Sequence, residues 1–179
     1  PYDPYGDYDP YLEGAYRSTT KDHEESLSGV FTKIGPGTLN LSGENTFTGQ
    51  TSIEGGTLLV SGSLSDETAV NIGDSGVYEV GADDTLGSIS GSGAINLGSS
   101  TLSVGGDNIS TQFSGVISGT GSLIKGGTGT LTLGGPNTYT GPTRLNGGVI
   151  EVIDVSALSG TTLISFDGGE LNVLSDLNL

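Results

Sequence analysis

A 26-residue block occurs twice in this chain. Residues 35–60 (GPGTLNLSGENTFTGQTSIEGGTLLV) align without a gap on residues 127–152 (GTGTLTLGGPNTYTGPTRLNGGVIEV), at an offset of 92 residues and with 14 identical positions. Lys33 and Lys125 keep the same offset. The identities fall on Gly, Thr, Leu and Asn, which are turn and strand residues. An internal repeat of this kind is typical of repeat architectures and constrains the fold more than any other feature.

Apolar residues also recur in short alternating runs. The leading positions of these runs, with Phe113 included, step by 18 to 21 residues. This spacing is too short for a βαβ unit, which needs about 30 residues or more, and it suits one turn of a β-solenoid. The runs are Leu39/Leu41, Leu58/Val60, Val77 with Val80, Ile95/Leu97, Leu131/Leu133, Ile150/Val152 and Leu171/Val173.

The composition agrees with a thin core repeated along a rod. The chain has 33 Gly, no Cys, Met or Trp, and 32% hydrophobic residues, so it cannot fill a thick globular interior. Glycine is too frequent for stable helix interiors, but it suits the tight corners between strands. We predict an all-β fold, a parallel β-helix (β-solenoid) of about eight rungs over residues 29–179.

Residues 1–28 differ in kind from the rest. Their opening, PYDPYGDYDPYLEGAY, holds five of the seven Tyr and three of the six Pro. We predict an extended acidic arm and linker here, able to lie on a second copy of the chain. An uncapped last rung would offer a complementary edge. The predicted self-association residues are Tyr2, Tyr5, Tyr8, Tyr11, Tyr16, Leu177 and Leu179.

The charge and the hydropathy of the chain argue against two classes of partner, nucleic acids and membranes. With 5 basic and 21 acidic residues the net charge is −16, which repels phosphate backbones and anionic lipids. We therefore expect neither nucleic-acid binding nor membrane insertion by this segment. No stretch approaches 18 consecutive apolar residues, and residues 1–30 lack the features of a signal peptide. We interpret both ends as processed or truncated.

The pattern G-x-G-T-L-x-L-x-G-x-N-T-[FY]-T-G-x-T, at Gly35–Thr51 and Gly127–Thr143, resembles the autotransporter-associated β-strand repeat of type V secretion passengers. Residues 29–33 and 121–125 resemble the usual lead-in of that family. The resemblance implies a bacterial, secreted, right-handed parallel β-helix of the kind found in large adhesins and surface proteins. It does not imply one particular activity.

The residues that stand out in the sequence are candidates for a structural role in turns and not for catalysis. We interpret Asn45, Asn137, Gly49 and Gly141 as turn residues, because Asn tolerates the left-handed region and bonds its own backbone at a corner. His23, the only histidine, has no evident partners for nucleophilic catalysis. Paired carboxylates for glycoside cleavage remain the main enzyme alternative. They would come from Glu44, Glu54, Glu79, Asp83, Asp84, Glu151 and Asp154.

Metal binding rests on clusters of Asp alone, at Asp3, Asp7 and Asp9 and at Asp83 and Asp84, and we interpret these as a solvated acidic surface. We predict no catalytic residue, no cofactor and no metal. The sequence favours a non-enzymatic extracellular rod on the bacterial surface, adhesive and self-associating, that contacts host or surface glycans or proteins. The alternatives are a subunit of an extracellular filament built by head-to-tail stacking with arm exchange and, more remotely, a polysaccharide-active β-helix enzyme.

Overall fold

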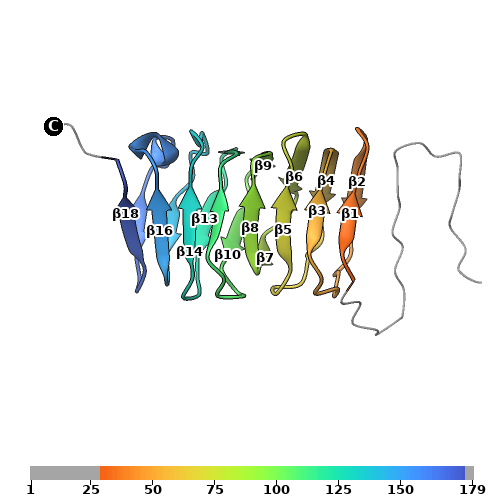
Figure 1. Ribbon diagram of the computed structural model, residues 1–179, viewed down its shortest axis with the longest axis horizontal. Helices are drawn as coiled ribbons and strands as arrows, with labels where there is room; N and C mark the ends of the chain where they lie inside the picture. The colour runs from red at the N-terminus through yellow and green to blue at the C-terminus, as the bar shows by residue number, and fades with distance from the viewer. Residues whose placement is uncertain (1–28, 176–179) are drawn as a thin grey trace, which may run out of the picture.

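The chain folds into a parallel β-solenoid of about seven turns (Figure 1). This computed structural model describes residues 29–175. The predicted arm at residues 1–28, with its five tyrosines, and the predicted end residues Leu177 and Leu179 lie outside the described residues. The expected parallel β-helix is confirmed.

Three parallel sheets run along the rod. The first sheet, called the long face below, has eight strands, β1 (Phe31–Lys33), β3 (Thr51–Ile53), β5 (Ala69–Ile72), β8 (Ser88–Gly91), β11 (Thr111–Phe113), β14 (Thr130–Leu133), β16 (Val149–Val152) and β18 (Glu170–Val173). The second sheet contains β7 (Asp84–Leu86), β10 (Thr101–Val104), β13 (Ser122–Lys125), β15 (Thr143–Leu145) and β17 (Ile164–Phe166). The third sheet contains β2 (Thr38–Leu41), β4 (Gly56–Val60), β6 (Gly76–Val80), β9 (Ala94–Asn96) and β12 (Val116–Ser118). A short 3-10 helix, η1 (Val155–Leu158), lies between β16 and β17.

The core is a single column of inward-facing side chains. Strands such as β14 and β16 alternate half-buried and buried residues, as a parallel sheet with one solvated side requires. The largest fully buried side chains are Tyr78, Tyr139 and Phe113. Each turn therefore buries its apolar side against the turns before and after it.

The predicted apolar series is wrong in two places. Ile95 pairs with Ile117 of the third sheet, whereas Phe113 belongs to the long face and pairs with Gly91. The 18-residue step between Ile95 and Phe113 is thus less than one turn and crosses from one sheet to another. In β6 it is Tyr78, not Val77, that is buried and pairs with Leu58.

The two copies of the repeat lie on different sheets. In the first copy β1 and β3 belong to the long face and β2 and β4 to the third sheet. Their counterparts 92 residues later, β13 and β15, belong to the second sheet, and β14 and β16 to the long face. The repeat therefore specifies two strands and the corner between them, and not one particular side of the rod.

Glycines shape this corner in the same way in both copies. Gly56 and its counterpart Gly148 have φ values of 67° and 59°, in the left-handed region that favours glycine. A Cβ atom at Gly56 would lie 2.4 Å from the carbonyl oxygen of Gly35, and one at Gly148 would lie 2.3 Å from that of Gly129. Both conformation and space thus require glycine at this position.

Candidate functional site

The long face carries a continuous row of outward polar side chains. Strand register places them side by side from β1 to β18, about 4.8 Å apart. Only one member of the row carries a charge, in a chain whose net charge is −16. The row consists of Thr32, Ser52, Asn71, Ser90, Gln112, Thr132, Glu151 and Asn172.

Some neighbours in this row bond to one another. The Nδ2 atom of Asn71 donates to Oγ of Ser90 (2.9 Å), and Oγ1 of Thr132 donates to Oε1 of Glu151 (3.3 Å). These contacts hold the side chains in register along the rod axis. The long face is thus a largely uncharged surface of hydroxyl and amide groups, some of which bond to their neighbours, and it is suited to hydrogen bonding rather than to ion pairing.

Each repeat encloses a buried lysine at its corner. The ammonium of Lys33, whose side chain is 5% exposed, donates to the carbonyl oxygens of Ile34 (3.0 Å), Gly35 (2.8 Å) and Gly55 (2.9 Å). Gly35 and Gly55 belong to successive turns, so this lysine joins two turns. Burial lowers the pKa of Lys33.

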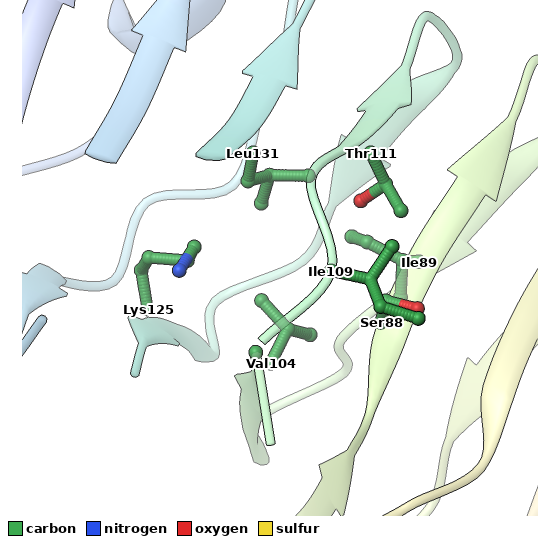
Figure 2. A pocket seen from close by; sticks show the side chains of 8 residues that line it. Ser88, Ile89, Val104, Ile109, Thr111, Lys125 and Leu131 are labelled. Carbon is green, nitrogen blue, oxygen red and sulfur yellow. The ribbon is translucent and has the colours of Figure 1, made fainter. Parts of the chain in front are cut away.

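Lys125 occupies the equivalent place in the second copy and is 2% exposed. Its ammonium donates to the carbonyl oxygen of Gly126. Burial lowers the pKa of Lys125, and the carboxylate of Asp107 opposes that shift. The lysine lines a small pocket between the second sheet and the long face, and Figure 2 shows Ile109 on the other side of that pocket.

The predicted turn asparagines join turns instead of adopting the left-handed region. Oδ1 of Asn137 accepts from the backbone N–H of Ile117 (2.8 Å), and its Nδ2 donates to the carbonyl oxygen of Ala157 (2.8 Å). Asn137 thereby links three successive turns. Nδ2 of Asn45 donates to the carbonyl oxygens of Gly43 (2.8 Å) and Ser63 (2.9 Å).

The predicted turn glycines lie just before β3 and β15. Neither Gly49 nor Gly141 is among the described residues with positive φ. Gly141 is buried, and a Cβ atom there would lie 2.0 Å from the carbonyl oxygen of Gly121 in the preceding turn. Gly49 is half-buried. At Gly141, close packing of successive turns explains the glycine.

A buried carboxyl group, that of Asp84, lies in β7, the first strand and one edge of the second sheet. Oδ2 of Asp84 accepts from the hydroxyl of Tyr78 (2.6 Å), and its Oδ1 accepts from the N–H groups of Leu64 and Thr85 (both 3.1 Å). Burial raises the pKa of Asp84, although these three hydrogen bonds oppose the shift and nearby Asp66 adds to it. Burial and the neighbouring carboxylate also raise the pKa of Tyr78 well above its usual value.

The carboxylates considered for glycoside cleavage are spread over the rod. Glu79 lies on the third sheet and Glu151 on the long face, whereas Asp84 points into the core. Asp154 accepts from the N–H of Ser156 as the N-cap of η1. Within residues 29–175 no three His, Asp or Glu side chains form a group that could hold a metal ion. No helix in that part of the chain is long and apolar enough to cross a membrane.

Comparison with known proteins supports the structural interpretation. Residues 31–60 and 123–152 match the passenger-associated-transport-repeat, and each match contains one lysine corner. This chain carries autotransporter passenger repeats. The predicted resemblance is therefore confirmed. No solved structure matches the chain.

The chain is also similar to part of an adhesin. The chain is 40% identical over 154 aligned residues to the adhesin BmaC autotransporter of Brucella suis biovar 1 (strain 1330). That similarity covers 78% of this chain and 4% of the adhesin, so the chain corresponds to a small part of its relative.

Sequence reasoning missed two features of these repeats. Lys33 and Lys125 share the offset of the repeat, which was a signal of a common role, but their burial could not be foreseen from a charged side chain. The Tyr78–Asp84 pair lies outside both copies of the repeat and left no pattern in the sequence.

Proposed function

We propose that this chain is a section of a non-enzymatic passenger rod on the bacterial surface, and that the rod contributes to adhesion through its long face. The passenger repeats and the similarity to an adhesin support a surface role for the section. The observation that carries the proposal is the continuous row of outward hydroxyl and amide groups on the long face. Host or surface glycans and proteins present complementary groups.

Binding to cells tests this assignment. The purified chain should bind to the surface of host cells, and placing two charges on the row, by Ser90→Glu with Gln112→Glu, should reduce that binding at least tenfold. These residues are outward-facing neighbours on β8 and β11, so the fold should be retained. The matched control is Thr38→Glu with Thr57→Glu, which are neighbours on β2 and β4 of the third sheet. Equal binding by both variants would exclude the long face, and no binding by the parent chain would exclude adhesion by this section.

Self-association is a second candidate, and a specific observation favours it. The turn formed by β16, η1 and β17 exposes Ile153, Val155, Leu163 and Phe166. Exposed large apolar side chains on consecutive elements are a feature of interaction sites. Sedimentation of the chain should show oligomers that Phe166→Ser disperses and that Ile109→Ser, an equally exposed position elsewhere on the rod, leaves intact. A monomeric parent chain would exclude this role for the turn.

A further inference from the structure

One asparagine of the rod makes no side-chain hydrogen bond within residues 29–175. That part of the chain contains eight asparagines, and seven of them donate or accept through the side-chain amide. The seven are Asn40, Asn45, Asn71, Asn96, Asn108, Asn137 and Asn172. Asn146 is the eighth, and its side chain is exposed. Its amide can therefore change its orientation without breaking a bond to the described residues.

The same asparagine is followed by glycine. Deamidation begins when the backbone nitrogen of the following residue attacks the side-chain carbonyl carbon of asparagine, and a bulky or branched side chain on that residue hinders the attack. Each of the other seven asparagines precedes Leu, Ile, Val or Thr. The nitrogen of Gly147 is thus the least hindered nucleophile. Because glycine has this effect in the unfolded chain as well, the preference for Asn146 does not depend on folding.

The corner between β15 and β16 also leaves the attacking nitrogen without a bond to break. This corner consists of Asn146, Gly147 and Gly148. Within residues 29–175 the backbone N–H of Gly147 donates no hydrogen bond. The backbone N–H of Asn146, in contrast, donates to the carbonyl oxygen of Lys125 (2.8 Å). The fold therefore anchors the asparagine but does not withhold the nitrogen that reacts with it.

The first copy of the repeat carries a carboxylate at the same corner. Glu54 occupies the position equivalent to Asn146, and its Oε1 accepts from the hydroxyl of Ser52 (2.6 Å). The residue equivalent to Ser52 is Arg144. Arg144 and Asn146 are both exposed, on either side of the buried Leu145, so they point to the same outward side. A carboxylate at position 146 would thus lie beside a guanidinium group.

We propose that Asn146 is a site of spontaneous deamidation in the folded rod, and that Arg144 pairs with the carboxylate that forms. The backbone nitrogen of Gly147 bonds to the side-chain carbonyl carbon of Asn146. The bond from that carbon to the amide nitrogen breaks, and the amide nitrogen leaves as ammonia with the proton of Gly147. Water then opens the cyclic imide at one of its two carbonyl carbons and gives aspartate or isoaspartate. Each conversion adds one negative charge at the edge of the second sheet, away from the row on the long face.

Peptide mapping by mass spectrometry tests the site. The purified chain, shown to be folded by circular dichroism, is kept in mildly alkaline buffer made with heavy-oxygen water, so that each new deamidation carries the heavy label. Asn146 should gain the label about tenfold faster than any other described asparagine, since no side chain hinders its neighbour. The variant Asn146→Gln should lose the main acidic species seen by ion-exchange chromatography. Faster labelling of another asparagine would overturn the proposal, as would an unlabelled Asn146 after a free peptide of residues 143–149 has fully reacted.

A double-mutant cycle tests the role of Arg144. Asp167 is exposed at the same corner of the next turn, because Phe166 pairs with Leu145. Asn146→Asp should therefore lower the midpoint of urea denaturation more in the Arg144→Ser background than in the parent chain, and added salt should reduce that difference. The uncharged control Asn146→Gln should have the same effect in both backgrounds. An equal effect of Asn146→Asp in both backgrounds would show that Arg144 does not pair with the new carboxylate, and would overturn that part of the proposal.

Discussion

Thr51 and Thr143 occupy equivalent positions in the two repeats, and only Thr143 has a hydrogen-bond partner for its buried hydroxyl. Tyr139 donates to Oγ1 of Thr143 (2.5 Å), which in turn donates to Oγ1 of Thr161 (3.1 Å). In the first copy the residue equivalent to Tyr139 is Phe47, and Oγ1 of Thr51 has no partner within residues 29–175. The first copy thus lacks both hydroxyl partners, because Phe47 replaces Tyr139 and Ala69 stands at the position equivalent to Thr161.

This difference predicts opposite effects for the same substitution. Thr51→Val should raise the free energy of unfolding by about 1 kcal/mol, because it removes a buried polar group that makes no bond. Thr143→Val should lower it by about 1 to 2 kcal/mol, because it leaves Tyr139 without an acceptor. Urea denaturation followed by circular dichroism measures both values, and a loss of stability in Thr51→Val would show that the hydroxyl has a partner.

Phe47→Tyr should supply the missing partner. The new hydroxyl should stabilise the chain by about 1 kcal/mol when Thr51 is present, as a neutral hydrogen bond does. The same change in the Thr51→Val variant should give no gain, so a double-mutant cycle separates the bond from a change in packing. Equal effects in both backgrounds would mean that the new hydroxyl reaches solvent instead.

The two lysine corners should respond unequally to Lys→Met. Lys33→Met leaves three carbonyl oxygens without their donor and should cost about 3 kcal/mol, whereas Lys125→Met removes one such bond and should cost about 1 kcal/mol. Methionine keeps most of the side-chain volume, so the difference reports mainly on hydrogen bonding. Thermal unfolding of the two variants provides the measurement, and a larger loss at Lys125 would contradict the geometry.

Asp84 should make stability depend on pH in an unusual direction. Since burial raises its pKa in the folded chain, the folded state binds the proton more tightly than the unfolded state. Its contribution is therefore greatest below the unfolded pKa of about 3.9 and is lost as the pH rises through the folded pKa.

Asp84→Asn retains an acceptor for Leu64 and removes the titration. The stability of this variant relative to the parent chain should increase as the pH rises from 4 to 7. The control Asp154→Asn alters an exposed carboxylate whose pKa is lowered by its bonds to Ser156, so its relative stability should change in the opposite sense. A pH-independent difference at Asp84 would show that its carboxyl titrates normally.

Much of the fold could be predicted from the repeat. The alternation of apolar and polar residues indicates strands, and the glycines indicate the corners between them. The assignment of each run to a sheet could not be predicted, because the connections between consecutive strands vary from one to eleven residues and so shift the position at which the next strand begins. Ile95 and Phe113 illustrate this, as their spacing looks regular although they belong to different sheets.

The candidate surface could be predicted from the sequence less well than the fold. The outward row from Thr32 to Asn172 joins residues that are adjacent only through strand register, and nothing in the sequence marks Thr or Ser as a surface group rather than a corner residue. Asn137 shows the same limit, because the backbone groups it bonds, in Ile117 and Ala157, lie one turn before it and one turn after it.

The second repeat is displaced by one sheet relative to the first, and this displacement changes the direction in which its surface residues face. A duplication of 92 residues moves a copied surface around the circumference as well as along the axis. Successive duplications would therefore wind identical patches around the rod in a spiral. A long passenger built in this way would offer the same contact group in several directions, and its binding would not depend on which side of the rod faces the partner.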